Sequence, residues 1–255
     1  MSATLENKVA IITGGGRGIG KEIALRYARE GAKLFLPDIS LERAKKAAEE
    51  IKAKGGEAVA MECDISDEKS AQKMAEKVME QYGRADILVN NAAIWYGVEA
   101  KPWDAWTVED WDRIFDVNVK GTWLCCKAIA PLMVKQSSGT IINMASHVFK
   151  VPDAQFFLGY ALTKSAVYTL TQCLARALGP SGITVNSIGP GLVATEASLV
   201  KGGIDDIFVN VVNAQSIKRR SEASDIVGIA VFLASKEADF ISGQFIIVDG
   251  GSVMV

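Results

Sequence analysis

The feature that most constrains the fold is a glycine-rich turn that joins a strand-like run to a helix-like run. Lys8–Thr13 is a short, apolar, β-branched run of the kind that forms a buried parallel strand. It leads directly into the turn Gly14–Gly20, after which apolar residues recur with helical spacing. Glycines let the backbone approach a pyrophosphate, and a helix N-terminus stabilises its charge. The sequence therefore predicts a dinucleotide-binding turn with the contact residues Gly14, Gly16, Arg17, Gly18, Ile19 and Gly20.

An acidic residue after the next strand-like run indicates which dinucleotide binds. The run Lys33–Pro37 is followed by Asp38, eighteen residues after Gly20. A carboxylate at about that distance binds the adenosine ribose of NAD and repels the additional phosphate of NADP. Arg17 favours the opposite choice, because a base in the turn can reach that phosphate. The carboxylate occupies the ribose position itself, so we expect NAD, with NADP as the alternative.

The rest of the chain alternates between strand-like and helix-like segments. The strand-like runs are Ala58–Met61, Ile87–Val89, Thr140–Met144, Thr184–Ile188 and Phe245–Val248, and the helical patterns lie near 41–54, 68–82, 109–135, 158–179 and 223–235. Such alternation predicts an α/β fold with a doubly wound parallel sheet covered by helices on both faces, a three-layer arrangement. No linker or repeat divides residues 1–255, so we expect one domain. Cofactor and substrate then lie beyond the carboxyl ends of the strands.

Composition and charge argue against several other classes of protein. The net charge of −2 gives no electrostatic footprint for nucleic acid. Cys63, Cys125, Cys126 and Cys173 have no metal-binding spacing, which favours buried thiols in a reducing compartment. The first residues lack the apolar core of a signal peptide, and no apolar stretch reaches membrane-spanning length. We expect a cytoplasmic protein with a small-molecule substrate and without a metal, a nucleic-acid partner or a membrane partner.

Tyr160 and Lys164, in the run Y-A-L-T-K, have the spacing of an acid–base pair on one helix face. Residues four apart are neighbours one turn from each other. A lysine ammonium there favours the phenolate, so we expect the pKa of Tyr160 to fall below its ordinary value of about 10. A tyrosine tuned in this way exchanges a proton with an alcohol or a carbonyl near neutral pH. The spacing is common by chance and gains its weight from the dinucleotide-binding turn upstream.

Five motifs in this order resemble the short-chain dehydrogenase/reductase family, in its single-domain subgroup. They are T-G-G-G-R-G-I-G, N-N-A-A, Asn118, Ser146 and Y-A-L-T-K, and the resemblance extends from Lys8 to the V-D-G-G segment at 248–251. It implies a Rossmann-type sheet of seven strands, which agrees with the alternation of segments. It also implies the interconversion of alcohols and carbonyls with NAD or NADP and without a metal.

The resemblance assigns catalytic roles to four residues. Tyr160 would be the general acid/base at the substrate oxygen, and Lys164 would lower its pKa and bind the nicotinamide ribose. Ser146 would hydrogen-bond the substrate oxygen and stabilise the charge that develops on it. Asn118 would help to hold a water that links Lys164 to solvent. From the residues alone, two other interpretations stay open, namely Ser146 as a cap of local backbone and Asn118 as a helix kink or side-chain cap.

The resemblance also places cofactor contacts in the loops after the strands. Asp64 matches the acid that binds the adenine amino group, although a helix N-cap at Asp64 or Ser66 is the alternative. The loop after the fourth strand would flank the adenine ribose, and the loop after the sixth strand would frame the nicotinamide. The matching residues are Ile65 beside Asp64, Asn90 and Ala92 after the fourth strand, and Pro190, Gly191, Val193 and Thr195 after the sixth.

Three features depart from the family's usual pattern. Ala93 replaces the final glycine of the N-N-A-G motif, and the loop Trp95–Thr107 is longer than usual. Ser146 and Tyr160 are one residue further apart than is commonest, and we expect the extra residue in the D-A-Q-F-F run. Ala93 alters loop packing and leaves both asparagines, and the extra residue reshapes the mouth of the substrate pocket. None of these departures removes a catalytic group.

Apolar side chains predominate in the loops that surround the substrate in this family. They are Trp95, Tyr96, His147, Phe149, Phe156, Phe157, Leu192 and Leu199, and a substrate-loop segment is expected near 192–220. Such a lining suits a hydrophobic ketone or secondary alcohol, including an aryl-substituted one. The alternative is that some of these aromatic residues pack the loops or a subunit contact. His147, beside Ser146, is interpreted as a residue that shapes the pocket, with a second catalytic acid as the alternative.

These observations lead to function hypotheses of two classes. We predict an NAD-dependent alcohol dehydrogenase or carbonyl reductase that interconverts a secondary alcohol and a ketone. Within the same family the alternative is a 3-oxoacyl-[acyl-carrier-protein] reductase, against which Asp38 argues because that reduction usually draws on NADPH. The alternative of another class is a cofactor-binding sensor without chemistry. Family members that lost activity usually lost the tyrosine or the lysine, whereas Tyr160 and Lys164 are both present.

Two helical patterns carry more apolar surface than one sheet face needs. They lie around 112–133 and 160–178, with the apolar residues Trp123, Leu124, Cys125, Ala128, Ile129, Leu132, Val167, Leu170 and Leu174. The family commonly pairs these helices across a two-fold axis. The resemblance therefore implies a homo-oligomer, with a tetramer expected.

Overall fold

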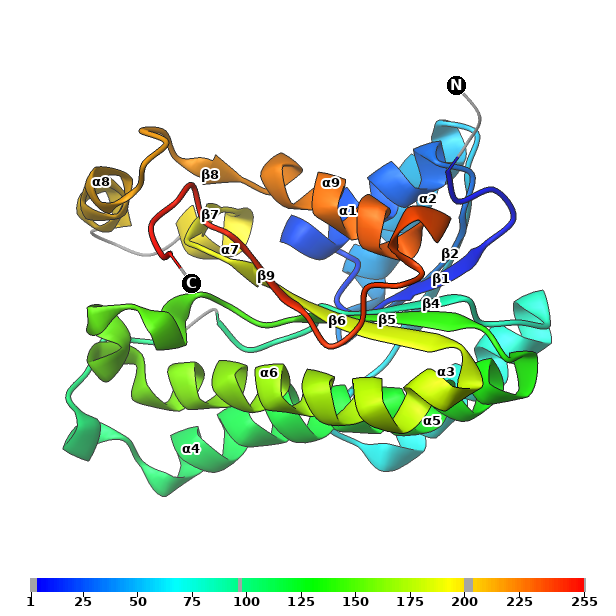
Figure 1. The fold of residues 1–255 in the computed structure, drawn as a ribbon, viewed down its shortest axis with the longest axis horizontal. Helices are drawn as coiled ribbons and strands as arrows, with labels where there is room; N and C mark the ends of the chain where they lie inside the picture. Colours follow the sequence, from blue (N-terminus) through cyan, green and yellow to red (C-terminus); the bar gives the residue numbers. More distant parts are fainter. Residues whose placement is uncertain (1–3, 96–97, 200–203, 255) are drawn as a thin grey trace.

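The computed structural model describes residues 4–95, 98–199 and 204–254. Within these ranges a seven-stranded parallel sheet has the strand order β3-β2-β1-β4-β5-β6-β9 (Figure 1). The strands are β1 (Val9–Ile12), β2 (Lys33–Asp38), β3 (Glu57–Glu62), β4 (Ile87–Asn90), β5 (Gly139–Met144), β6 (Ile183–Pro190) and β9 (Phe245–Val248). The predicted fold class and all seven predicted strands are confirmed.

Helices cover both faces of this sheet, which gives the three predicted layers (Figure 1). One face carries α1 (Gly18–Arg29), α2 (Leu41–Ala53) and α9 (Ser224–Ala234), and the other carries α3 (Glu68–Tyr82), α4 (Val108–Phe115), α5 (Thr122–Gln136) and α6 (Leu158–Leu178). Side-chain caps begin three of them: Ser40 accepts from the Arg43 N–H at α2, Asp67 from the Ser70 N–H at α3, and Thr107 from the Asp110 N–H at α4. The N-cap of α3 is therefore Asp67 and neither Asp64 nor Ser66.

The strand order reverses at β1, which lies between β2 and β4. Loops that leave neighbouring strands at such a point diverge, and ligands bind outside the carboxyl ends there. Those ends bring together segments that are far apart in the sequence. Asp38 ends β2, Asn90 ends β4, Met144 ends β5 and Pro190 ends β6. The predicted site residues therefore gather along one edge of the sheet.

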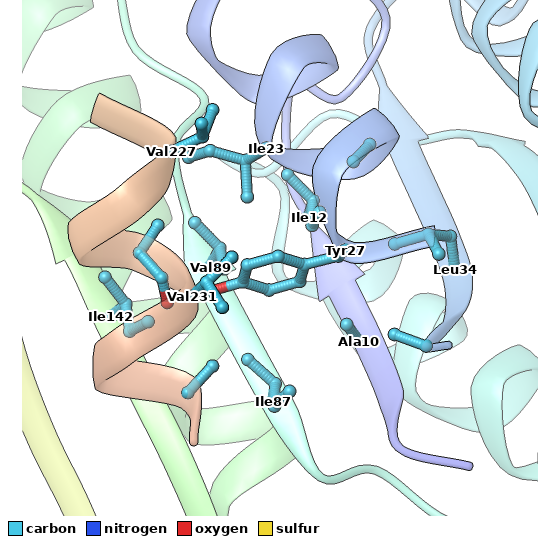
Figure 2. Close-up of a cluster of buried hydrophobic side chains, with 14 of the residues drawn as sticks. Ala10, Ile12, Ile23, Tyr27, Leu34, Ile87, Val89, Ile142, Val227 and Val231 are labelled. Carbon is cyan, nitrogen blue, oxygen red and sulfur yellow. Dashed lines mark hydrogen bonds between the residues drawn. The ribbon is translucent and has the colours of Figure 1, made fainter. Parts of the chain in front are cut away.

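A buried tyrosine fixes the helix that follows the glycine turn. Tyr27 on α1 is fully buried and lies among the side chains of Ile12, Val89 and Val231 (Figure 2). Its hydroxyl donates a hydrogen bond of 2.7 Å to the carbonyl of Ala230 on α9, so this buried polar group is satisfied. Burial raises the pKa of the Tyr27 phenol, which keeps it protonated. The contact ties α1 to α9 and fixes the direction in which the N-terminus of α1 points.

The helical pattern predicted over 109–135 is one path that a π-helical turn divides. The turn covers Asp116–Gly121, between α4 and α5. Such turns insert an extra residue into a helix and are frequent at functional sites. Gly121 in the turn lies against Ile65, whose Cγ1 is 2.8 Å from the position that a Cβ would take. The predicted helical pattern ran through this turn without a break, although a helix kink was one of the interpretations left open for Asn118 within it.

The segment near 192–220 contains short elements that the sequence pattern did not predict. They are β7 (Val193–Ala194), α7 (Glu196–Leu199) and α8 (Ile204–Ala214), and β8 (Ser221–Glu222), which follows, pairs with β7. These elements lie at one end of the molecule, beside the C-terminal turn (Figure 1). No helix within the described ranges is long and apolar enough to cross a membrane.

Candidate active site

Tyr160 and Lys164 lie in the first turns of α6, beside the carboxyl end of β5. The Lys164 Nζ atom is 5.6 Å from the centroid of the Tyr160 ring. It donates a hydrogen bond of 2.7 Å to the carbonyl of Met144, the last residue of β5. Only 4% of Lys164 is exposed, so its charge has little access to water. The helix and the strand end therefore hold the two side chains of the predicted pair next to each other.

The pKa of Tyr160 is shifted in the direction opposite to the prediction. Burial raises the pKa of its phenol, and a hydrogen bond with the Ser146 side chain opposes this only in part. Burial also lowers the pKa of Lys164 to about 8. The prediction counted the attraction between an ammonium and a phenolate and neglected the cost of burying either charge. Burial therefore disfavours both the phenolate of Tyr160 and the ammonium of Lys164.

Ser146 bridges the ends of two strands at the same place. It follows β5, is 7% exposed, and its hydroxyl donates 3.3 Å to the carbonyl of Pro190 at the end of β6. The same oxygen accepts from the Val148 N–H at 3.2 Å. The segment between Ser146 and Tyr160 forms two 3-10 turns, Val148–Lys150 and Pro152–Phe157, and the D-A-Q-F-F run lies in the second.

Asn118 uses its side chain to join the loop after β4 to α6. Its Oδ1 accepts from the Ile94 N–H at 2.7 Å, and its Nδ2 donates to the Ile94 carbonyl and to Thr163 Oγ1, both at 3.2 Å. Asn118 is 1% exposed, and Thr163 is the residue before Lys164. This amide therefore positions both the loop and the helix that carries the catalytic pair. Its role in holding a water stays a prediction.

The glycine turn has the shape that a pyrophosphate requires. Gly14 and Gly18 adopt left-handed backbone conformations, with φ of +64° and +55°. A Cβ on Gly16 would meet Asp38 and Arg43 at 2.8 Å. The N-terminus of α1 has no side-chain cap and no acidic residue in its first turn, so nothing there opposes an anion. Arg17 and Ile19 flank this terminus, and Ile19 packs its side chain on the core.

Asn91 and Thr13, which the sequence analysis did not select, hold this turn in place. Asn91 Nδ2 donates to the carbonyls of Thr13 and Gly14 at 3.0 and 3.2 Å. Thr13 Oγ1 accepts from the N–H groups of Asn91 and Ala92 at 3.0 and 3.1 Å. The second asparagine of N-N-A-A was the available signal. These four hydrogen bonds fix the backbone of the glycine turn relative to the loop after β4.

Asp38, at the predicted adenosine end, already has several partners in the protein. Its carboxylate accepts from the N–H groups of Gly16 and Ser40 at 3.1 and 2.9 Å. Arg43 Nη2 donates to the same carboxylate at 3.0 Å, and Asp38 is only 4% exposed. The sequence analysis missed Arg43, which opens α2 on the same side as Asp38. Two aligned hydrogen bonds and an ion pair fix the direction of the carboxylate.

The other predicted adenosine contacts differ in what their side chains touch. Asp64 is exposed and accepts from both the N–H and the hydroxyl of Ser66. Ile65 is 6% exposed and belongs to the core. Asn90 is 4% exposed and donates to Asn143 Oδ1 at 2.8 Å. Ile65 and Asn90 therefore direct their side chains into the protein, which leaves backbone groups for a ligand.

The predicted nicotinamide segment lies against the glycine turn. Gly191, after β6, donates to the Val248 carbonyl at 3.2 Å. The Thr195 Cβ is 3.6 Å from the position that a Cβ of Gly18 would take. Ser198 braces this segment, because its hydroxyl donates to the Val193 carbonyl at 2.7 Å. The structure thus brings residues from both halves of the chain to the N-terminus of α1.

Aromatic side chains cover Tyr160, but only some of the predicted ones do so. The Trp95 ring lies 4.7 Å from the Tyr160 ring and 5.6 Å from the Phe157 ring. Phe149 instead stacks with Tyr168 and Phe245, so it packs between α6 and β9. Phe156 and Leu199 are 45% and 49% exposed, and Leu192 is partly buried. Tyr96 lies outside the described residues.

His147 directs one ring nitrogen at a buried carboxylate that the sequence analysis did not select. Its Nδ1 is 2.9 Å from Oδ2 of Asp249, which is 3% exposed. The backbone N–H of His147 donates to the Pro190 carbonyl at 3.1 Å. The histidine is thus held beside Ser146 by a strand end and by the C-terminal turn.

Comparisons with known proteins agree with this geometry. Residues 14–253 match a family model described as enoyl-(acyl carrier protein) reductase. The chain is 36% identical over 249 residues to 3-oxoacyl-[acyl-carrier-protein] reductase from Staphylococcus epidermidis, which covers 97% of this chain and 100% of that protein. It is 39% identical over 263 residues to galactitol 2-dehydrogenase from Agrobacterium fabrum, which covers 98% and 99%.

A solved structure gives the same result. It is described as a short-chain type dehydrogenase/reductase from Mycobacterium marinum, and it superposes with a TM-score of 0.92 at 32% identity over 100% of this chain and 98% of that chain. The fold and these relatives define an oxidoreductase of a class that uses NAD or NADP. The chain belongs to the short-chain dehydrogenase/reductase family.

Proposed function

We propose that the protein interconverts a secondary alcohol and a ketone with NAD, and that the substrate carries an apolar or aryl group near the reacting carbon. The arrangement of Tyr160, Ser146 and Lys164 at the carboxyl end of β5 carries this proposal. Trp95, 4.7 Å from Tyr160, provides an aromatic wall next to the reacting position. The relative that acts on galactitol supports the alcohol and ketone chemistry.

Each side chain has one task in this reaction. The bound nicotinamide dinucleotide supplies or accepts the hydride. Tyr160 donates its proton to the substrate oxygen during reduction and accepts it back during oxidation. The Ser146 hydroxyl donates a hydrogen bond to the same oxygen, where negative charge develops. Lys164, one turn from Tyr160, stabilises the phenolate that remains once the proton has left.

Asp38 supports NAD as the cofactor. Its buried carboxylate lies next to the glycine turn, and a ribose phosphate there would meet a negative charge. Arg43 reduces that repulsion, because it pairs with the same carboxylate at 3.0 Å. We therefore propose a preference for NAD that is measurable but not absolute.

A second candidate function is the reduction of 3-oxoacyl thioesters, which the Staphylococcus epidermidis relative at 36% identity favours. The two functions differ in cofactor and in substrate. Initial rates of NADH and NADPH oxidation with an aryl methyl ketone and with an acetoacetyl thioester separate them. The proposal expects the highest kcat/KM for NADH with the ketone. A higher value for NADPH with the thioester would establish the second candidate, and no turnover with bound NADH would favour a sensor.

We also propose that α5 and α6 form a subunit interface in a homotetramer. An apolar groove on this face is lined by Trp123, Cys126, Lys127, Ala130, Pro131, Val134, Lys135, Leu174 and Leu178. Four of the apolar residues that the sequence predicted for this interface do not lie on it. Leu124, Cys125, Ile129 and Val167 are core residues with 0 to 4% exposure. Val134→Glu should reduce the mass measured by light scattering, whereas Val209→Glu on α8 should not. A monomeric wild type at micromolar concentration would contradict this assembly.

A further inference from the structure

The side chain of His147 is held in a defined direction beside the proposed catalytic serine. Its Nδ1 atom is 2.9 Å from Oδ2 of Asp249, and only 12% of the histidine side chain is exposed. Asp249 is 3% exposed and lies in the C-terminal turn, a hundred residues further along the chain. A buried carboxylate in contact with an imidazole needs an explanation, because it is costly unless its oxygens are satisfied.

The other hydrogen bonds of Asp249 show which of the two side chains, His147 or Asp249, carries the hydrogen between them. Its Oδ1 accepts from the N–H groups of Gly251 and Ser252 at 3.0 and 3.2 Å. Its Oδ2 accepts from the Val253 N–H at 3.0 Å. A carboxylate that accepts from three N–H groups acts as an acceptor toward His147 as well, so Nδ1 is the donor. In the neutral ring, Nε2 then carries the lone pair and can only accept.

The imidazole ring of His147 packs against the segment that follows β6. Cε1, which links the two nitrogens, is 3.4 Å from the position that a Cβ of Gly191 would take. Gly191 follows Pro190, whose carbonyl accepts from both the Ser146 hydroxyl and the His147 N–H. Nε2 has no hydrogen-bond partner among residues 4–95, 98–199 and 204–254. The residue next to Ser146 therefore carries a ring nitrogen that no protein group among the described residues occupies.

The turn that holds Asp249 is itself fixed. Ile217 N–H donates to the Gly250 carbonyl at 2.9 Å, and the Ser216 hydroxyl donates to the Gly251 carbonyl at 3.1 Å. These bonds join the C-terminal turn to the segment that follows α8. Because the carboxylate is held from several sides, His147 has a fixed orientation before a substrate binds, which favours a specific contact.

We propose that His147 determines substrate specificity by accepting a hydrogen bond from a hydroxyl on the carbon next to the reacting carbon. The substrate class is then a vicinal diol in one direction and an α-hydroxyketone in the other. Trp95, on the other side of Tyr160, contacts the apolar remainder of the substrate. Asp249 is a positioning residue that acts through His147. This inference rests on the proposed alcohol and ketone chemistry and specifies the substrate further.

Three ketones of matched shape test the proposal by reduction with NADH. They are 1-hydroxy-1-phenylpropan-2-one, its methyl ether 1-methoxy-1-phenylpropan-2-one, and 1-phenylpropan-2-one without the extra oxygen. The wild type should prefer the hydroxyketone to both others by tenfold or more in kcat/KM, because only its hydroxyl donates to Nε2. In His147→Phe the ratio of kcat/KM for the hydroxyketone to that for the other ketones should approach one. In His147→Gln, which keeps an acceptor oxygen, the ratio should lie between that of His147→Phe and that of the wild type. Phe149→Leu, two residues along, is the matched control and should keep the wild-type ratio.

The chain has one histidine, so its tautomer can be read directly. Two-bond ¹⁵N–¹H correlation spectra of untagged protein should show the hydrogen on Nδ1, and Asp249→Asn should change that pattern. A hydrogen on Nε2 would overturn the assignment, as would equal reduction of the hydroxyketone and its methyl ether. A wild type that reduces the plain ketone with no preference contradicts this inference alone. A protein that reduces none of the three contradicts the proposed function and this inference together.

Discussion

At the adenosine end of the site, the Asp38 carboxylate accepts from two backbone N–H groups and pairs with Arg43. At the reacting end, burial raises the pKa of Tyr160 and lowers that of Lys164 to about 8. Among the residues that the structure describes, the Lys164 ammonium donates one hydrogen bond, to the Met144 carbonyl. The protein therefore provides partners for the Asp38 carboxylate at the adenosine end, whereas burial at the reacting end disfavours the Tyr160 phenolate and the Lys164 ammonium.

This difference matches what each end has to do. The adenosine end only binds, so a preformed carboxylate with fixed partners lowers the cost of ordering on binding. The reacting end must pass a proton in either direction, and groups with displaced pKa values in a buried site are suited to that task. Buried ionisable groups of this kind reduce stability in exchange for activity. The following predictions test that contrast from both ends.

The largest effect is expected at the reacting end, from Tyr160→Phe. The change removes the transferable proton and keeps the ring that contacts Trp95. We expect kcat to fall by about 10² to 10⁴, the range for loss of a general acid or base, with NADH affinity changed by less than about threefold. Tyr168→Phe, on the same helix but outside the site, is the control and should retain turnover. Steady-state rates and a fluorescence titration with NADH measure both quantities, and substantial ketone reduction by Tyr160→Phe would refute the mechanism.

A smaller effect is expected at the adenosine end, from Asp38→Ala. Removal of the carboxylate removes repulsion toward a 2′-phosphate and leaves Arg43 beside it. We expect the ratio of kcat/KM for NADP to that for NAD to rise by about tenfold to a hundredfold, which corresponds to about 1.4 to 3 kcal/mol.

The higher ratio for NADP in Asp38→Ala has two possible causes, the loss of repulsion by Asp38 and attraction by Arg43, and an Arg43 variant distinguishes them. In Asp38→Ala/Arg43→Ala most of the increase should disappear if Arg43 receives the phosphate. Calorimetric titration with ADP-ribose and with 2′-phospho-ADP-ribose gives the same comparison without turnover, and Glu42→Ala is an exposed control. A wild type that already prefers NADP tenfold would show that Arg17 outweighs Asp38.

The smallest effect on the chemistry is expected from Asn118→Ala, which lies between the two ends. The change leaves both polar backbone groups of Ile94 without their side-chain partner. We expect the free energy of unfolding to fall by about 1 to 3 kcal/mol, with a modest loss of kcat. Urea denaturation and initial rates measure the two. Unchanged stability together with a loss of turnover of a hundredfold or more would instead assign Asn118 to proton transfer.

The sequence predicted the sheet well because buried parallel strands are read from local apolar runs. The seven predicted runs differ from β1 to β6 and β9 by at most two residues at either end. It did not predict the π-helical turn at Asp116–Gly121, since a single inserted residue leaves the helical spacing of apolar residues almost unchanged. The short elements of 192–220 were missed because two-residue strands carry no usable periodicity.

At the site, sequence reasoning identified residues that belong to motifs and missed the residues that orient them. Asn91, Arg43 and Asp249 were not selected, because their contacts join positions that only the fold brings together. The pKa of Tyr160 was predicted in the wrong direction for a related reason. Spacing in the sequence shows a neighbouring lysine but does not show how deeply both groups are buried.

Burial of the reacting end disfavours the charged form of Lys164. This effect is tested most directly through Lys164→Met. In the folded protein the pKa of Lys164 is about 8, against 10.5 for the ordinary side chain. The unfolded chain therefore binds more protons between these values, and wild-type stability rises with pH across that window. Below the folded-state pKa of about 8, burial of the ammonium lowers the free energy of unfolding by its full amount, which the shift in pKa puts at about 3 kcal/mol. Lys164→Met removes this cost and so gains stability, but it also loses the hydrogen bond to the Met144 carbonyl, which offsets part of the gain.

Urea denaturation of both proteins without cofactor, at steps from pH 7 to pH 10.5, is the measurement. The account predicts that Lys164→Met is more stable than the wild type by about 1 to 3 kcal/mol at pH 7, and that the difference shrinks steadily as the pH approaches 10.5. Burial raises the pKa of Tyr160 and keeps its phenol protonated in both folded proteins across this window, so only its titration in the unfolded chain contributes, and that is common to both. Lys46→Met, which removes an exposed ion pair with Glu42 at the surface, should give no such pH dependence. A Lys164→Met protein that is less stable than the wild type by the same amount at every pH would contradict the account.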